Sequence, residues 1–349
     1  MLAKVSVLGH FAEGENLLNG QTVKTKIITE ELQKQLGKDE VLKIDTHGGL
    51  KTLLKAPVHS FKAFQKSTNI LMFPAHNGLR VYTPLLTIMK CFFKVRKLHY
   101  VVIGGWLPGF LKKRKILANM LKKFDGIYVE TNTMKKALEE QGFSNVYVMP
   151  NCKKLTVLSE EELIYPSEKP YKLCTFSRVM KEKGIEDAVN VVKKINSELG
   201  YNAYSLDIYG QIDNAQIEWF ENLKTQFPEY INYCGCVDSD KSVETLKKYF
   251  ALLFPTYYEG EGFAGTLIDA FSAGVPVIAS DWRYNAEIVN DGVGYVYPTG
   301  KNDVFFEILR ENAYKPDKLL EKKLFCLHES EKYNIESVVQ ILIDRMIDN

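Results

Sequence analysis

An acidic segment with closely spaced glycines, in the second half of the chain, has the composition of a ligand-binding loop. The glycines within residues 260–265 leave the backbone bare, so a ligand could approach its N–H groups closely. The carboxylates of Glu261 and Asp269 flank the start of a helix expected from about Thr266. Free N–H groups at a positive helix end, beside two carboxylates, suit a ligand with both phosphate and hydroxyl groups, such as a sugar nucleotide.

A structural role is the alternative for part of this segment. Thr266 and Asp269 have the spacing of a capping box, in which Asp269 only satisfies the first turn of the helix. Both interpretations of Asp269 stay open on the sequence alone. Capping explains neither the loop glycines nor Glu261, so the segment as a whole favours binding.

Two cations stand where a diphosphate would be bound. Arg178 and Lys183 lie between a strand expected at 172–176 and a helix expected from about Ile185. Backbone N–H groups, the helix dipole and both side chains would act together on an anion there. Hydrogen bonds to charged groups contribute about 1.5–3 kcal/mol each. The alternative is a solvated loop, since Lys and Arg are common between strands and helices.

The elements that must position these residues alternate along the whole chain. Short apolar runs followed by longer amphipathic stretches predict parallel sheets covered by helices, hence the α/β class. A length of 349 residues favours two domains, expected at 1–160 and 161–349, with a helix at about 335–349 packing back on the first. Two doubly wound, Rossmann-like domains facing a cleft would bring their strand C-termini to it.

The predicted elements are as follows. Strands are expected at 4–8, 41–44, 70–73, 98–103, 126–130, 146–149, 172–176, 205–209, 231–234, 252–255, 277–279 and 294–296, and helices at 25–36, 133–141, 185–199, 215–226, 242–249 and 266–273.

The composition indicates a globular protein of the cytoplasm. Hydrophobic residues make up 46% and charged residues 25% of the chain, and no apolar run approaches the roughly 20 residues of a membrane-spanning helix. The apolar run at the N-terminus is too short, and too soon followed by polar residues, for a signal peptide. The six cysteines show no disulfide or zinc spacing, which favours reduced thiols and no metal site.

The charge is unevenly distributed. Residues 1–160 hold 25 Lys and Arg against 12 Asp and Glu, and no acidic residue occurs between Asp45 and Asp125. In residues 85–97 and 110–124 the cations alternate with large apolar side chains, which suits an anionic membrane surface. The alternative is a solvated basic face. Nothing in the chain resembles a nucleic-acid-binding module, so no such partner is expected.

Taken together, the motifs resemble a known enzyme family. The pattern Arg-x4-Lys-Gly at 178–184 is followed by Glu-Gly-Phe-Ala-Gly-x3-Asp-Ala-x3-Gly-x-Pro at 261–276. It resembles the family-4 retaining glycosyltransferases of the GT-B fold. The resemblance is strong over residues 170–300 and looser over 1–160.

The resemblance implies roles for particular residues. Arg178 and Lys183 would hold the diphosphate of a nucleotide-sugar donor, and Glu261 would contact its sugar. Asp269 stands where the family has a ribose-binding Glu, one methylene longer, and Ala264 replaces a glycine. The remaining donor-binding candidates are Gly210, Gly262, Phe263, Ala264, Gly265 and Thr266.

The first half offers weaker candidates. A glycine-bearing loop after the first strand resembles the family's N-terminal loop near the donor phosphates and the acceptor; Gly20, Gln21, Thr22 and Lys24 are its candidates, and an ordinary surface loop is the alternative. It is not a Walker loop. His76, directly after a strand, is a candidate for the acceptor side.

The resemblance further implies a function. We expect a retaining, metal-independent transferase, without a cofactor, that moves a hexose from a UDP-sugar or GDP-sugar to a saccharide or lipid-linked acceptor. Bacterial surface polysaccharide synthesis, at the inner face of the cell membrane, is the expected setting. The alternatives are a non-catalytic partner that binds a sugar nucleotide, and another GT-B enzyme such as a nucleotide-sugar epimerase.

Overall fold

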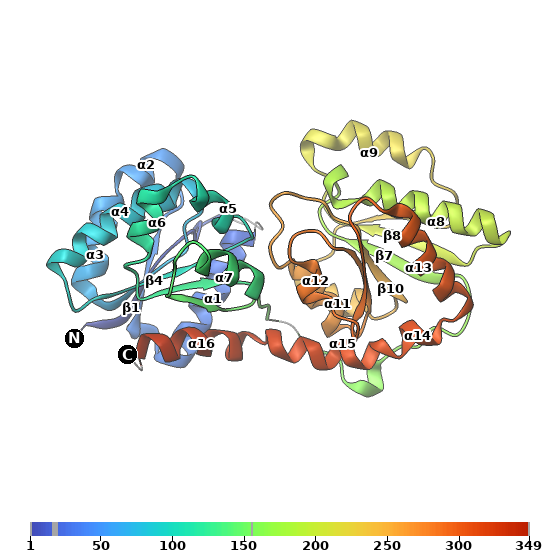
Figure 1. The fold of residues 1–349 in the computed structure, drawn as a ribbon. Coiled ribbons are helices and arrows are strands. Elements are labelled where there is room, and N and C mark those ends of the chain that lie inside the picture. Colours follow the sequence, from blue (N-terminus) through green and yellow to red (C-terminus); the bar gives the residue numbers. More distant parts are fainter. Residues whose placement is uncertain (1, 16–19, 155, 348–349) are drawn as a thin grey trace. The chain divides into compact units, whose positions relative to one another are not determined.

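The computed structural model describes residues 2–15, 20–154 and 156–347, and it divides into two compact units. The first unit comprises residues 1–154 and 334–349, and the second comprises residues 155–333. Each unit contains one six-stranded parallel sheet with helices on both faces (Figure 1). The predicted α/β class is confirmed, and the ends of the predicted strands differ from those in the structure by at most three residues.

The first unit has the strand order β2-β1-β3-β4-β5-β6. Its strands are β1 (Ala3–Gly9), β2 (Val41–Asp45), β3 (Ser67–Met72), β4 (Lys97–Val101), β5 (Gly126–Val129) and β6 (Val146–Val148). Its helices are α1 (Gly20–Leu36), α2 (Gly49–Leu54), α3 (Ala56–Lys66), α4 (His76–Phe92), α5 (Leu107–Lys112), α6 (Lys115–Leu121), α7 (Asn132–Glu139) and α16 (Ile335–Ile347).

Helix α16 packs on the first unit although it is the last element of the chain. Val5 and Val7 of β1 share a buried cluster with Ile28 of α1 and Leu342 of α16. Successive strand residues point to opposite faces, so Val5 and Val7 both project toward the face that α1 and α16 cover. Residues 348–349 of the helix expected here lie outside the described residues.

The second unit has the strand order β12-β11-β10-β7-β8-β9. Its strands are β7 (Tyr171–Phe176), β8 (Tyr204–Tyr209), β9 (Ile231–Gly235), β10 (Ala251–Phe254), β11 (Val277–Ser280) and β12 (Gly294–Tyr297). Its helices are α8 (Ile185–Leu199), α9 (Ile217–Lys224), α10 (Ser242–Leu246), α11 (Gly265–Ser272), α12 (Asn285–Ile288), α13 (Asn302–Tyr314), α14 (Asp317–Leu320) and α15 (Lys322–Ser330).

Each sheet reverses its strand order once, and this reversal locates the candidate sites. In the first unit the chain moves from β1 outward to β2 and then crosses back to β3. In the second unit it moves from β7 to β8 and β9 and crosses back to β10. At such a switch point two neighbouring loops leave the carboxyl edge in opposite directions, and ligands bind in the crevice between them.

Among the described residues, no helix combines the length and the apolar content that crossing a bilayer requires.

Candidate functional site

The switch point of the second unit joins the loops that follow β7 and β10. Gly184 precedes helix α8 with a φ of 69°, and a Cβ there would lie 2.2 Å from the carbonyl oxygen of Pro255. Only glycine fits this close approach in the left-handed region. The backbone N–H of Tyr257 donates to the carbonyl of Glu182 at 2.8 Å. The loops after β7 and β10 are therefore held in contact through their backbones.

Lys183 and Glu261, one on each loop, form a buried ion pair. Lys183 Nζ lies 2.5 Å from Glu261 Oε2, and the two side chains are 11% and 8% exposed. The hydroxyl of Thr256 donates to the same carboxylate oxygen at 2.9 Å. The ammonium also lies 5.0 Å from the ring centroid of Tyr258. The structure thus brings together a cation and an acid that are 78 positions apart in the chain.

Arg178 lies on the loop after β7, which also carries Lys183, and its side chain is more exposed than that of Lys183. Its Nη1 contacts Asp213 Oδ2 at 3.2 Å, and its side chain is 54% exposed. Gly210 follows β8 with a φ of 134°, and a Cβ there would lie 1.8 Å from the carbonyl oxygen of Ser177. Gly210 therefore lets the β7 and β8 loops touch, a contact that positions the start of the loop carrying Arg178.

Helix α11 overturns the capping interpretation of Asp269. The helix begins at Gly265, its N-cap is Ala264, and no side chain caps it. Asp269 is buried, at 2% exposure, and its Oδ1 accepts a hydrogen bond of 2.9 Å from Ser242 of α10. Thr266 is in the first turn rather than at the cap, because the helix starts one residue earlier than the apolar spacing predicted.

The loop before α11 is anchored by an aromatic side chain. Phe263 is buried and packs edge-on against Tyr333, with ring centroids 4.8 Å apart. Gly262 lies in the same irregular stretch, between Glu261 and α11. The hydroxyl of Thr266 is buried, and no described residue hydrogen-bonds it. Such a hydroxyl at a helix N-terminus has hydrogen-bonding capacity left for a ligand.

In the first unit, the structure corrects the prediction of an N-terminal loop. Gly20, Gln21, Thr22 and Lys24 belong to the first turns of helix α1, which begins at Gly20 rather than at Thr25. The buried face of these turns is polar, since Thr22 and Lys24 occupy it, so the apolar pattern could not reveal it. Residues 16–19 of the expected loop lie outside the described residues.

A chain of polar contacts runs along the carboxyl edge of this sheet. His10 Nδ1 lies 2.7 Å from Thr22 Oγ1, and His10 Nε2 lies 2.8 Å from His47 Nδ1. His47 Nε2 continues the chain to Glu15 Oε1 at 3.1 Å. Burial, and then the charge of His47, lower the pKa of His10.

Lys24 does not join this chain but pairs with another buried carboxylate. Its Nζ lies 2.6 Å from Glu130 Oε1, and the two side chains are 5% and 3% exposed. This pair ties α1 to the residue that follows β5.

Sequence reasoning missed His10 and His47 as site residues. His10 directly follows β1 and His47 comes two residues after β2. Their positions at the carboxyl ends of neighbouring strands are the signal that could have found them, but the register that brings the two rings together appears only in the folded sheet.

A cavity of about 460 Å³ lies at this switch point. Its lining includes His10 and Gln21 together with residues 74–78, where the chain passes from β3 into helix α4. His76 begins helix α4 and stacks on Trp106, with ring centroids 3.9 Å apart. Burial, then the charges of Arg80 and Arg114, lower the pKa of His76. The candidate His76 thus lines a cavity that also contains a residue sequence reasoning missed.

Comparison with known proteins defines the class of this fold. The lipopolysaccharide outer core galactosyltransferase WaaB matches with a TM-score of 0.74 at 15% identity, covering 99% of each chain. Anabaena Alr3699/HepE in complex with UDP matches with a TM-score of 0.74 at 13% identity, covering 99% of this chain and 100% of that one. At such identities the likeness shows the fold, which is GT-B.

The sequence comparisons specify the family. Residues 161–319 match the family described as "Glycosyl transferases group 1". Over 196 residues the chain is 31% identical to the UDP-N-acetylglucosamine–peptide N-acetylglucosaminyltransferase GtfA subunit of Streptococcus gordonii, an alignment that covers 54% of this chain and 36% of that protein. The matched region contains the motifs at 178–184 and 261–276, so residues 161–319 are similar to the group 1 glycosyltransferases, within a chain of the GT-B fold. The chain spans little more than a third of the length of that relative.

Proposed function

We propose that the protein transfers a hexose-type sugar, with retention of configuration, from a UDP-sugar to a saccharide or lipid-linked acceptor. The observation that carries the proposal is the buried pair of Lys183 and Glu261 at the switch point of the second unit. Two similar proteins support uracil as the nucleobase: Alr3699/HepE is in complex with UDP, and the Streptococcus gordonii protein is named for UDP-N-acetylglucosamine. A GDP-sugar remains the other donor to test.

In this proposal the cations bind the donor diphosphate. Lys183 and Arg178 lie on the loop that leads into helix α8, whose first backbone N–H groups also point toward an anion. When the acceptor oxygen attacks the anomeric carbon, the bond to the diphosphate breaks and negative charge grows on the departing oxygen. Preorganised cations stabilise that charge. No divalent ion is required for this neutralisation.

The acceptor proton leaves with the diphosphate. The acceptor approaches on the face that the diphosphate vacates, and a departing phosphate oxygen takes the proton as the new glycosidic bond forms. The protein positions both reactants and supplies no nucleophile.

Glu261 has two roles in this arrangement. It orients the Lys183 ammonium, and it receives hydroxyl groups of the donor sugar. A carboxylate has about four acceptor positions, and Lys183 and Thr256 use two of them. Asp269 is assigned to the ribose hydroxyls, with Ser242 holding its carboxylate in place.

The first unit would bind the acceptor in the cavity that contains His10 and His76. One observation favours a second acceptor class. The Streptococcus gordonii relative is named for transfer to a peptide, so a Ser- or Thr-containing peptide is the alternative acceptor.

We also propose docking on an anionic membrane surface through the basic segment 85–124. Within it Ile88, Phe92, Val95 and Ile116 are 56%, 81%, 85% and 77% exposed. Exposed apolar side chains among cations suit the interfacial region of a bilayer. This would place the protein on the inner face of the cell membrane, where lipid-linked saccharides are extended in bacterial surface polysaccharide synthesis.

Donor hydrolysis without acceptor tests the enzymatic proposal. A panel of UDP- and GDP-sugars is incubated with the full chain, and release of the nucleotide is followed. Slow turnover of one UDP-sugar is expected. Tight UDP binding with no turnover of any donor, with or without acceptors, would instead favour the non-catalytic partner.

Co-sedimentation with vesicles tests the membrane proposal. At low salt the protein should pellet with vesicles containing anionic lipid and stay in the supernatant with neutral ones. Absence of pelleting with anionic vesicles would contradict it. Because electrostatic attraction is screened, pelleting should decline as salt increases.

A further inference from the structure

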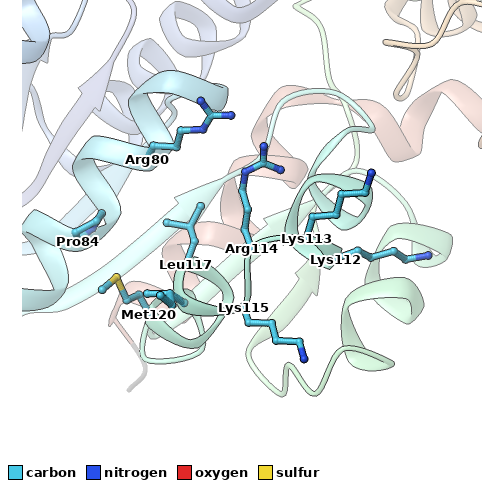
Figure 2. A pocket seen from close by; sticks show the side chains of 9 residues that line it. Arg80, Pro84, Lys112, Lys113, Arg114, Lys115, Leu117 and Met120 are labelled. Atoms are coloured by element: carbon cyan, nitrogen blue, oxygen red, sulfur yellow. The ribbon is translucent and has the colours of Figure 1, made fainter.

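The first unit contains a second cavity, of about 600 Å³, with cations at its rim and apolar side chains beneath them. Arg80 of helix α4 and the four basic residues 112–115, at the junction of α5 and α6, supply the cations. Leu117 and Met120 contribute to the apolar wall. In the view of Figure 2, the side chains of Arg80 and Arg114 extend from these two elements toward the same region, above Leu117 and Met120. We call this cavity the basic pocket.

The charge of the basic pocket is not balanced by protein carboxylates. None of its lining residues is acidic, and no described carboxylate lies within 4.0 Å of Arg80 or Arg114. This agrees with the absence of Asp and Glu from residues 46–124. Like charges held close together repel, so an anion that enters gains from several cations at once.

The guanidinium groups at the rim are supported by one aromatic ring. The Arg114 guanidinium lies 3.8 Å from the ring centroid of Phe110, and its Nη1 donates to the Phe110 carbonyl at 2.8 Å. The Arg80 guanidinium lies 5.3 Å from the same centroid. Arginine presents a planar fork of donors that matches two oxygens of a phosphate. A phosphate is therefore the anion that this arrangement fits best.

The basic pocket adjoins the cavity at the switch point of the first unit. Phe110, which supports both arginines, contacts His76 edge-on at a centroid distance of 5.1 Å. His76 in turn lines the switch-point cavity. A ligand with its hydroxyl end in that cavity could thus extend past His76 and place a phosphate between Arg80 and Arg114.

We propose that the basic pocket binds the phosphate of a lipid-linked acceptor, with the first carbons of the lipid chain against Leu117 and Met120. The choice of occupant rests on the proposed transferase function. The apolar wall distinguishes a lipid phosphate from free phosphate, which would gain nothing from it. Ile116, 77% exposed at the edge of the pocket, continues this apolar surface outward.

Calorimetric titration of the full chain with decyl phosphate, below its micellar concentration, tests the proposal. Decyl phosphate should bind at least tenfold more tightly than inorganic phosphate, and octyl glucoside, which has a chain but no charge, should not compete. If inorganic phosphate binds as tightly as decyl phosphate, or if decyl phosphate does not bind, the lipid-phosphate site is refuted.

Paired variants locate the binding. Arg80→Gln combined with Lys113→Gln should weaken decyl phosphate binding at least tenfold. The control, Lys62→Gln combined with Lys66→Gln on helix α3, removes the same charge and should stay within twofold of the wild type. Equal losses in both would show diffuse attraction and overturn the site. Thermal unfolding verifies that both variants fold.

A UDP titration of the same samples separates this proposal from the transferase function. UDP binding without decyl phosphate binding would overturn the basic pocket alone. Decyl phosphate binding that depends on Arg80, without UDP binding, would support the pocket and contradict the donor site.

Discussion

The two switch points of the chain hold their polar groups in different ways. In the second unit a pair of opposite charge, Lys183 with Glu261, lies where the β7 and β10 loops meet at the backbone of Gly184. In the first unit a chain of hydrogen-bond contacts, from Thr22 through His10 to His47, lies beside a cavity of about 460 Å³. The same topology therefore carries an ion pair in one unit and a chain of groups that both donate and accept hydrogen bonds in the other.

This difference matches two kinds of ligand. A diphosphate has constant charge near neutral pH, so rigid cations serve it well. A hydroxyl-bearing acceptor is recognised by hydrogen bonds, and groups that can both donate and accept suit it better. The predictions below test whether the contrast between the two units is real, beginning with the largest expected effect.

Lys183→Gln should lower kcat/KM for sugar transfer by about a hundredfold or more, because one preorganised cation on the leaving group is lost. Steady-state kinetics with the preferred donor would measure it. Lys181→Gln is the matched control: it lies two positions away, is exposed, and should change kcat/KM less than about threefold. Similar losses in both variants would mean that the loop attracts the donor only through its general charge.

Gly210→Ala should destabilise the second unit by about 3 kcal/mol, since a Cβ would lie 1.8 Å from the Ser177 carbonyl oxygen at a φ of 134°. Gly200→Ala shares a positive φ, of 73°, but its Cβ would meet nothing within 4 Å. Gly200→Ala should lower the free energy of unfolding by only about 1–2 kcal/mol, which is the cost of a left-handed backbone without a steric clash. Urea denaturation compares the two, and equal costs would show that the contact between the β7 and β8 loops is unimportant.

The stability of the first unit should fall as the pH drops from 6.5 toward 4. Burial lowers the pKa of His99 from 6.5 to about 4; the charge of Asp125 opposes this shift, and the charges of Lys97 and Lys90 add to it. In this pH range His99 binds a proton in the unfolded chain but not in the folded protein. The contribution of His99 to stability is therefore fully present above pH 6.5 and is lost as the pH falls below it.

The decline attributable to His99 is about 3 kcal/mol between those two pH values. His99→Gln should flatten this part of the pH profile, whereas the exposed control His328→Gln should leave it unchanged. Urea denaturation at several pH values measures the profiles. An unchanged slope in His99→Gln would contradict the assignment.

His10→Gln should lower the rate of transfer to the acceptor by about tenfold, because two hydrogen bonds of about 1 kcal/mol each are disturbed. UDP affinity should stay within twofold. If His10→Gln weakens UDP binding by as large a factor as it slows transfer, the assignment of the donor to the second unit and the acceptor to the first is contradicted.

Removal of divalent ions should have the smallest effect. With excess EDTA the rate of transfer should stay within about twofold of the untreated enzyme, because Lys183 and Arg178 neutralise the diphosphate. A rate that disappears with EDTA and returns with Mg²⁺ would show that these cations are insufficient.

The sequence predicted the elements around the second switch point well. Local signals define them: Gly184 and Gly210 have backbone requirements that no other residue meets, and charged residues follow predicted strands. The pairing of Lys183 with Glu261 depends on β7 and β10 being neighbours. The family resemblance implied only that both residues contact the same donor, and residue spacing alone did not predict the pairing.

The first switch point could be predicted only in part. The start of helix α1 was placed five residues too late because its buried residues, Thr22 and Lys24, are polar. His10 and His47 stand 37 positions apart and meet only through the parallel pairing of β1 with β2. No periodicity in the sequence encodes such a contact.

One measurement tests the central claim, that the second unit binds a UDP-sugar through Lys183 at its switch point. Calorimetric titration with UDP should show saturable binding to the wild type and to Lys181→Gln, and at least tenfold weaker binding to Lys183→Gln. Equal UDP affinity in Lys183→Gln and the wild type, with both proteins folded, would contradict it.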